Sequence, residues 1–327
     1  MQLVLDTNGL VMKKRNNCFW ITHKKGRRMI SPHKVSSIAV THDCLLSTSA
    51  IRLAIQHQIP IVLFSATGRP QGRLWSPYFG SIATLRRQQL RFGETPAATA
   101  VIIAWFIAKV GQQIVHLKQL KTRKQSQRVM LDQGIQQLYE QQTALDVWQH
   151  VSPTEARPHL MGIEGTLSRT YWKTVAVGLP KDWKYTRRSR RPAHDRFNAA
   201  LNYLYGMLYS EVEAAIITAG LDPHLGILHA DEYNRPTFSY DMIEPFRPWV
   251  DRLLTRLIWE KKLTPACFED KKGGFWISKA GKPVIIPAFN DFMQERQYYG
   301  GELRSRRSHI YRTASLFARQ LESTTDE

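Results

Sequence analysis

The chain of 327 residues is long enough for two domains, and its 43% apolar and 10% aromatic content is that of a globular protein. This composition excludes a wholly disordered chain. Its 46 lysines and arginines against 27 aspartates and glutamates give a net charge of +19. Such an excess favours a polyanionic partner, with nucleic acid ahead of an anionic membrane, and a basic surface without a binding role is the alternative.

The cysteines and the N-terminus bear on the compartment of the protein. Cys18, Cys44 and Cys267 are far apart and form no C-x-x-C pair, so we expect free thiols in a reducing environment and no zinc knuckle. The first residues lack the basic and apolar pattern of a signal peptide. The most apolar segment, residues 97–108, is shorter than the roughly 20 residues that span a bilayer. These features predict a cytoplasmic protein with no membrane partner.

Residues 1–80 predict a small β-rich domain, either a sheet or a sandwich. Short apolar or alternating runs are separated by Asn-Gly, Lys-Gly and Ser-Pro turn signals. Within this domain Ser47–His57 predicts a helix with Ser47 or Thr48 as its N-cap, and Ile59–Phe64 predicts a buried strand. The glycines and prolines at positions 68, 70, 72 and 77 predict a linker to the rest of the chain.

From about residue 81 the periodicity becomes helical, which predicts an all-α domain over residues 81–327. Apolar residues recur at three- and four-residue spacing, and a short hairpin is expected at Gly273–Ile286. The predicted helices are Thr84–Phe92, Ala97–Lys121, Gly134–Trp148, Arg196–Gly220, Pro248–Lys262 and a basic C-terminal helix, Glu302–Leu321. The fold class is therefore predicted as α+β, with a small β domain before a larger helical domain.

Four residues are candidates for a metal site. Asp241 and Glu244 share one face if their segment is helical, and they can then bind one cation together. Pro245 disfavours helical ψ at Glu244, so Glu244 is also a candidate N-cap of the next helix, which leaves Asp241 as the stronger ligand. His229 ends an apolar segment, and Glu164 lies at a predicted helix start. Imidazole and carboxylates together suit Mg²⁺ or Mn²⁺.

Each of these residues also has an ordinary structural interpretation, as a helix cap, a first-turn acid or a core histidine. Buried acids and an imidazole without a cation would nevertheless be costly, and they require pairing or a metal. The set as a whole therefore favours a metal site.

The run Lys184–Arg196 concentrates arginines, interleaved with Tyr185, and predicts contact with a nucleic-acid backbone. Arginine forks bind phosphate in a bidentate manner, and a nearby ring can stack on a base. A solvated charge run is the alternative. On the helix that follows, Asn198 and Asn202 either anchor the wall of the active site or hold a helix–helix contact, and we expect the second. The candidate backbone-binding residues are Lys184, Arg187, Arg188, Arg190, Arg191 and Arg247, and the family resemblance described next implies that they bind DNA.

Four ordered blocks resemble the CRISPR-associated adaptation integrase family, Cas1. They are Gly162-x-Glu164-Gly165 with Tyr171; Arg190-Arg191-Pro192 leading to Asp195-x-x-Asn198-x-x-Leu201-Asn202-Tyr203; Leu221-Asp222-Pro223 running to Gly226-x-Leu228-His229; and Arg235-Pro236 with Asp241-x-x-Glu244-x-Phe246-Arg247-Pro248. The resemblance implies that the N-terminal β domain forms a homodimer and that a Cas2 partner bridges two dimers. It also implies Glu164, His229 and Asp241 as metal ligands, with Glu244 as the neighbouring acid.

The resemblance further implies a reaction on DNA, with these four residues as the catalytic set. A spacer-DNA 3′-hydroxyl attacks a phosphodiester of the CRISPR repeat, and the same site with water as nucleophile acts as an endonuclease. Two other classes of function remain possible from the sequence. A non-catalytic scaffold that binds nucleic acid would tolerate loss of Glu164 or Asp241, whereas a metallohydrolase for small substrates has no use for a charge of +19.

Overall fold

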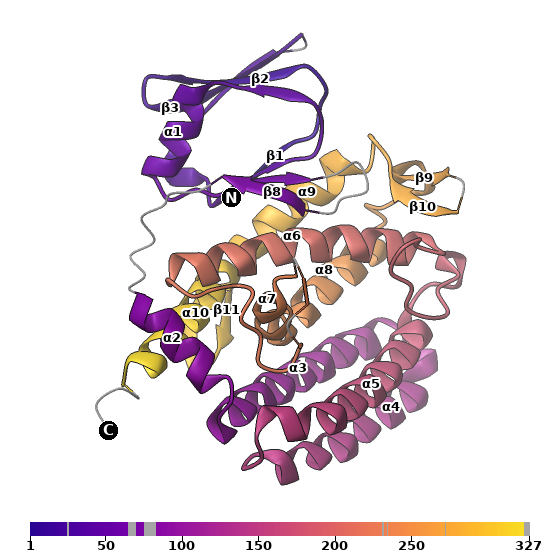
Figure 1. Cartoon of the computed structure of the whole chain (residues 1–327). Helices are drawn as coiled ribbons and strands as arrows, with labels where there is room; N and C mark the ends of the chain where they lie inside the picture. The colour runs from indigo at the N-terminus through magenta and orange to yellow at the C-terminus, as the bar shows by residue number, and fades with distance from the viewer. Residues whose placement is uncertain are drawn as a thin grey trace.

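The computed structural model describes residues 1–24, 26–64, 70–74, 83–230, 232–233, 235–271 and 273–323. A strand-rich part precedes residue 75, and a mostly helical part follows residue 82 (Figure 1). Each part has its own cluster of buried apolar side chains, so two hydrophobic cores form. The α+β class predicted from the sequence is confirmed. The domain boundary near residue 80 and the homodimer stay predictions.

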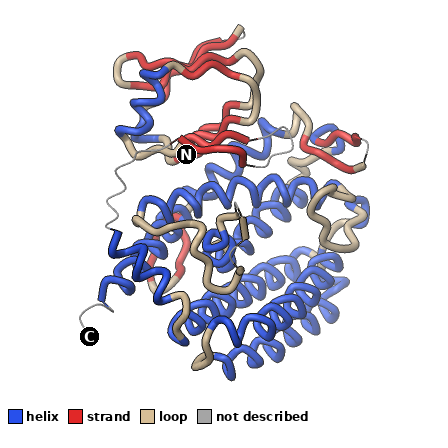
Figure 2. Tube along the Cα trace, viewed as in Figure 1, coloured by secondary structure: helices blue, strands red, loops and turns tan. Residues whose placement is uncertain are grey.

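The strand-rich part contains two four-stranded sheets with helix α1 (Thr48–Gln56) beside them (Figure 2). The first has the order β1-β5-β7-β8, in which β1 (Gln2–Leu5), β5 (Ser37–Val40) and β7 (Ile61–Phe64) are parallel and β8 (Pro70–Leu74) is antiparallel to β7. The second has the order β4-β3-β2-β6, in which β2 (Leu10–Arg15), β3 (Cys18–His23) and β4 (Gly26–Ile30) are antiparallel and β6 (Cys44–Leu46) is parallel to β2. Ser47 caps α1 as predicted, because its Oγ accepts the N–H of Ala50 at 3.2 Å.

The linker predicted around residues 68–77 is wrong where the structure describes it. Pro70 and Gly72 belong to β8, which pairs with β7, while Gly68 and Pro77 lie outside the described residues. Pro70 is the first residue of a strand at the end of its sheet, a position where a missing N–H removes no required ladder bond. Pro70 and Gly72 therefore belong to an edge strand and not to a linker.

The helical part contains nine helices and two hairpins among the described residues. The helices are α2 (Ala83–Phe92), α3 (Pro96–Arg123), α4 (Arg128–Gln142), α5 (Pro153–Gly178), α6 (Arg196–Thr218), α7 (Thr237–Met242), α8 (Arg247–Trp259), α9 (Lys282–Gln294) and α10 (Arg306–Ser323). The hairpins pair β9 (Phe268–Lys271) with β10 (Gly274–Ile277) and β11 (Arg296–Tyr299) with β12 (Glu302–Ser305). This part is therefore mostly helical rather than all-α.

Two predicted boundaries in this part are wrong for identifiable reasons. The hairpin expected at Gly273–Ile286 ends at Ile277, because α9 begins at Lys282 with Pro283 in its first turn, where proline is favoured. The last helix begins at Arg306 and not at Glu302, because Gly300 and Gly301, with φ of +58° and +80°, close a hairpin first.

Helix α3 is the centre of the helical part. It packs against α4, α5, α8 and the short turn Glu244–Phe246. Its length and composition would suffice for a membrane span, but 56% of its most apolar window is buried inside the chain, as in a core helix. Gly178 allows close packing of α5 on α3, because an added Cβ there would lie 2.9 Å from Leu120 Cδ1.

The two parts meet along the edge strand β1. The backbone N–H of Gln2 donates to Asn290 Oδ1 at 2.8 Å, and Asn290 Nδ2 donates to the carbonyl of Gln2 at 3.1 Å. Ser36 adds a hydrogen bond from its Oγ to Glu211 Oε1 at 3.1 Å. Helix α9 thus covers a strand edge that would otherwise present unpaired backbone groups.

Candidate active site

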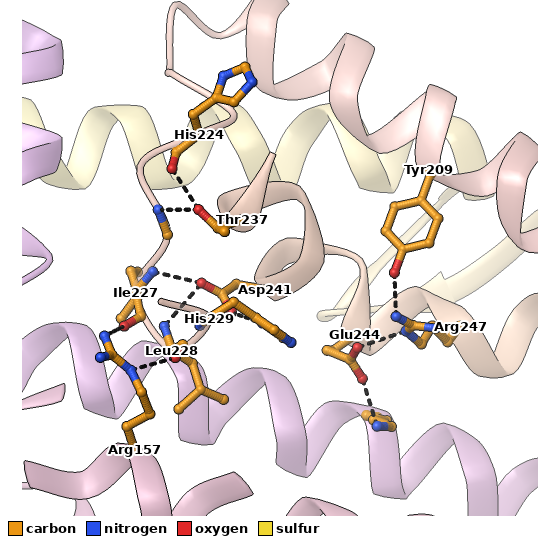
Figure 3. Close-up of polar contacts among 12 residues, drawn as sticks. Arg157, Tyr209, His224, Ile227, Leu228, His229, Thr237, Asp241, Glu244 and Arg247 are labelled. Carbon is orange, nitrogen blue, oxygen red and sulfur yellow. Dashed lines mark hydrogen bonds and ion pairs between the residues drawn. The ribbon is translucent and has the colours of Figure 1, made fainter. Parts of the chain in front are cut away.

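Asp241 on α7 fixes the loop that carries His229. Its Oδ2 accepts the N–H groups of Ile227 at 2.7 Å and Leu228 at 3.1 Å, and its Oδ1 accepts the N–H of His229 at 3.2 Å (Figure 3). The same Oδ1 lies 2.6 Å from Nδ1 of the His229 ring. The Asp241 side chain has no exposed area. Its two oxygens therefore already accept four hydrogen bonds, which leaves no open position for another ligand.

The sequence around this loop explains its shape. An added Cβ on Gly226 would lie 2.5 Å from the carbonyl oxygen of His229 and 2.7 Å from Thr237 Oγ1, so only glycine fits. Thr237 Oγ1 accepts the N–H of Gly226 at 3.1 Å and donates to the carbonyl of His224 at 2.6 Å. From α5, Arg157 Nε donates to the carbonyl of Leu228 at 2.7 Å. The loop is thus held from both sides.

These contacts orient the imidazole of His229. A carboxylate oxygen accepts hydrogen bonds, so Nδ1 carries a proton toward Asp241, and in the neutral ring the free lone pair is then on Nε2. The ring points from the loop toward Glu244 in Figure 3, and the side chain is 31% exposed. This is the arrangement in which a histidine binds a metal through Nε2 while a carboxylate holds its other nitrogen.

A second cluster joins Glu164 of α5 and Glu244 through a lysine of α3. Lys109 Nζ lies 2.5 Å from Glu164 Oε1 and 2.6 Å from Glu244 Oε2. Burial lowers the pKa of Lys109, but the charges of Glu244 and Glu164 outweigh it and the pKa is raised. Burial raises the pKa of Glu244, whereas Arg247 and Lys109 lower it to about 2. Both groups are therefore charged at neutral pH.

Two expectations about these acids are wrong. Glu244 does not cap α8, because its Oε1 lies 2.7 Å from Arg247 Nε and its other oxygen binds Lys109. Pro245 places Glu244 at the start of a short 3-10 turn, Glu244–Phe246, between α7 and α8. Glu164 lies in the middle of α5 and not in a first turn. There Ser168, one turn later, donates to its Oε1 at 2.9 Å.

The side chains of this cluster provide donors for a divalent cation. Within the described residues, no three His, Cys, Asp or Glu side chains converge as a ready-made metal site. Instead His229 pairs with Asp241, and Lys109 holds Glu164 and Glu244. Two carboxylates and an imidazole nitrogen suit Mg²⁺ or Mn²⁺. The ammonium between the two carboxylates occupies a place where positive charge is required, so the residues fit a cation that displaces Lys109 from one carboxylate.

The basic run is divided between exposed and internally bound side chains. Lys184, Arg187, Arg190 and Arg191 are exposed. The guanidinium of Arg188 is instead bound within the chain, because its Nη1 donates to Asn198 Oδ1 at 2.7 Å and its Nη2 to Asn202 Oδ1 at 2.6 Å. Arg247 is bound by Glu244.

Asn198 and Asn202 therefore hold the loop of the basic run, residues 184–195 (the basic loop), onto α6. The helix–helix contact expected for them is wrong. The stacking role expected for Tyr185 is also wrong, because its ring is buried with its centroid 4.5 Å from that of Phe197. The buried ring of Tyr185 therefore anchors the basic loop.

Sequence reasoning missed several residues of this site. They are Lys109, Arg157, Ser168 and Tyr209, whose hydroxyl accepts a hydrogen bond from Arg247. Only Lys109 carried a signal. It follows the apolar run 97–108 on a helix that had to be buried, and a lysine in a core requires charged partners. The others are ordinary helix residues whose roles depend on long-range packing.

Comparison with known proteins gives the family. A family model described as CRISPR associated protein Cas1 matches residues 3–291. A CRISPR-associated endonuclease Cas1 from Archaeoglobus fulgidus is 28% identical over 313 residues, which cover 92% of this chain and 90% of the relative.

Two solved structures share the fold. A casposase bound to its integration product has a TM-score of 0.83 at 22% identity and covers 100% of this chain and 92% of that one. A chain of a Cas6-RT-Cas1–Cas2 complex has a TM-score of 0.77 at 21% identity, covering 99% of this chain and 35% of that one. With a family match over nearly its whole length, this chain belongs to the Cas1 family.

Proposed function

We propose that this protein is a divalent-metal-dependent DNA integrase of CRISPR adaptation. It joins the 3′-hydroxyl ends of spacer DNA to the CRISPR repeat by transesterification, and it acts as an endonuclease when water is the nucleophile. Membership in a family whose relatives are named CRISPR-associated endonucleases supports the proposal. The observation that carries it is the oriented His229 ring, which points toward Glu244, together with the carboxylates of Glu244 and Glu164, which already hold the ammonium of Lys109.

The metal would be held by Glu164, Glu244 and Nε2 of His229. Asp241 instead holds the ring through Nδ1, because its oxygens are fully used by three backbone N–H groups and the imidazole. The proposal thus differs from the ligand set implied by the resemblance, in which Asp241 was a ligand and Glu244 a neighbour. A carboxylate behind a metal-binding histidine fixes its tautomer and orientation.

When bound, Mg²⁺ or Mn²⁺ would lower the pKa of the attacking hydroxyl and stabilise charge on the phosphate. The chain itself has two tasks. Arg247 and Lys109 keep Glu244 in its charged form, and Ser168 holds Glu164 in place. The exposed cations Lys184, Arg187, Arg190 and Arg191 bind the backbone of double-stranded DNA, on a loop that Arg188 anchors to α6.

The proposal includes a cytoplasmic homodimer formed through residues 1–80, with Cas2 joining two dimers. The similarity to a chain of a Cas6-RT-Cas1–Cas2 complex supports a Cas2 partner. A non-catalytic scaffold is the second candidate. It is disfavoured because a scaffold gains nothing from burying Lys109, Glu244 and Arg247 together, since buried ion pairs contribute little net stability.

Strand transfer tests the proposal. Wild type, Glu164→Gln and His229→Asn are mixed with short duplex DNA and a plasmid carrying the repeat, with Mn²⁺ or Mg²⁺, with and without Cas2. Glu155→Gln, an exposed acid on the same helix, is the matched control. We expect joining by wild type and Glu155→Gln, and loss of joining in the other two while DNA binding in EDTA persists. Tight binding by all proteins without joining would instead establish a scaffold.

A further inference from the structure

A second basic site lies away from the catalytic cluster. A cavity of about 340 Å³ opens between the C-terminal half of α3, the middle of α8, the end of α9 and the start of α10. Four arginines line it, Arg123, Arg252, Arg256 and Arg306, and Glu295 is the one acid among its described lining residues. His116 and Thr255 also line it.

The lining charges do not cancel. Glu295 is shared between two guanidiniums, with Arg256 Nη1 at 3.0 Å and Arg306 Nη1 at 2.9 Å from its two oxygens. His116 contributes no charge at neutral pH, because burial and the charge of Arg252 lower its pKa to about 3. Four guanidiniums and one carboxylate therefore leave three positive charges around the cavity.

Two of the guanidiniums have donors without partners. The Nε atoms of Arg252 and Arg306 are buried and make no hydrogen bond. Arg306 is 8% exposed and is fixed by its hydrogen bond to the carbonyl of Phe292 at 2.8 Å and by its position 3.7 Å above the Phe292 ring. Arg252 Nη2 donates to Gln297 Oε1 at 2.9 Å. Because these two Nε atoms are shielded from solvent, an anion in the cavity would be bound by the other guanidinium N–H groups of its lining and by their net positive charge.

The cavity is separate from the proposed metal site. Arg247 and Arg252 are five residues apart on α8, so they project about 140° apart around its axis. Arg247 faces Glu244, whereas Arg252 faces the cavity. From His116, which lines the cavity, buried hydrogen bonds run through Tyr171 to Asp251. A ligand in the cavity would thus bind without the metal.

We propose that this arginine pocket binds a phosphate group, carried either by a free nucleotide or by a nucleic-acid backbone. Guanidinium forks match phosphate oxygens in a bidentate manner, and the neutral His116 and the Thr255 hydroxyl line the same cavity without adding negative charge. The volume is at the lower end of small-molecule sites, which suits one phosphate with its sugar or base.

Isothermal titration in EDTA tests the proposal independently of metal-dependent joining. The probes are inorganic phosphate, dAMP and a short single-stranded oligonucleotide, each against NaCl of equal ionic strength. The variants are Arg252→Gln and Arg256→Gln. Arg319→Gln, an exposed arginine of α10 outside the pocket, is the matched control. Circular dichroism checks that each variant is folded, and the half-exposed Arg256 provides a variant that keeps the buried part intact.

We expect saturable binding of a phosphate-bearing probe to wild type and Arg319→Gln, and binding at least about tenfold weaker in the two pocket variants. Because an oligonucleotide also binds through the basic run, the pocket variants decide between the two sources. A larger loss of dAMP binding in these variants would identify a free nucleotide as the ligand, and a larger loss of oligonucleotide binding would identify a backbone phosphate. Absence of binding beyond NaCl, or wild-type affinity in both folded pocket variants, would overturn the proposal.

Discussion

The ammonium of Lys109 lies 2.5 Å from Glu164 Oε1 and 2.6 Å from Glu244 Oε2, so one buried lysine joins carboxylates from two separate segments. Lys109 and Glu244 are buried, and buried charges are tolerated only while they remain paired. Lys109 thus acts as an internal cation at the place where a divalent metal is proposed to bind. Stability and metal affinity should be linked through this residue.

Replacing Lys109 tests that link. Lys109→Met leaves Glu164 without its cation and Glu244 with Arg247 alone, so we expect a loss of about 3 kcal/mol in the free energy of unfolding in metal-free buffer. Mn²⁺ should restore part of that loss and should stabilise the variant more than wild type, because no ammonium competes for the carboxylates. Thermal unfolding with and without Mn²⁺ measures both effects. The control is Lys121→Met, on the same helix as Lys109, which removes a partly exposed ion pair with Asp132 of α4. Equal Mn²⁺ stabilisation of Lys109→Met and wild type would contradict the link.

Asp241 is predicted to act through His229 and through the loop. In Asp241→Asn one oxygen can still accept backbone N–H groups, but the amide NH₂ cannot accept from the imidazole, so the ring loses its fixed tautomer. We expect Mn²⁺ binding to weaken by about 10- to 100-fold while the fold persists. Asp241→Ala should instead reduce stability, because it leaves the N–H groups of Ile227, Leu228 and His229 without an acceptor. Wild-type Mn²⁺ affinity in a folded Asp241→Asn would refute this role.

Substitutions of neighbouring arginines in the basic loop should differ in their effects on DNA binding and on stability. Arg187→Gln removes an exposed phosphate contact, so the slope of log K against log salt for DNA binding should fall by about 0.9, with no change in melting temperature. Arg188→Gln removes the bonds to Asn198 and Asn202, so it should lower the melting temperature. Filter binding at several salt concentrations and thermal unfolding separate the two. Identical behaviour of the two variants would show that the loop is not anchored as described.

His116 should make stability depend on pH. Its folded-state pKa of about 3 lies below the unfolded value of 6.5, so the unfolded chain takes up a proton first as the pH falls. Between pH 6.5 and pH 5 this removes about 2 kcal/mol of stability. Asp251, whose pKa burial raises to about 6, acts in the opposite direction, so the comparison requires a variant. Denaturant unfolding of wild type and His116→Asn at both pH values should show a smaller loss in the variant, and parallel losses would contradict the assignment.

The sequence predicted the fold class because its signals are local. Ser47 caps α1, and the apolar spacing of residues 97–121 lies within α3. The predictions are wrong where contacts between residues far apart in the sequence determine the structure. Pro70 could not be recognised as an edge-strand residue without β7, and Glu244 could not be told from a helix cap without Lys109, 135 positions earlier. Tyr185 was misjudged because its neighbours in sequence are charged whereas its neighbours in space are Trp172 and Phe197.

Anomalous diffraction at the manganese edge, from crystals grown with Mn²⁺, tests the central claim most directly. The account predicts a peak bonded to Glu164, Glu244 and Nε2 of His229, with Lys109 moved away from at least one carboxylate and Asp241 still hydrogen-bonded to Nδ1. A peak bonded to an Asp241 oxygen, or saturating Mn²⁺ with no peak among these side chains, would contradict it.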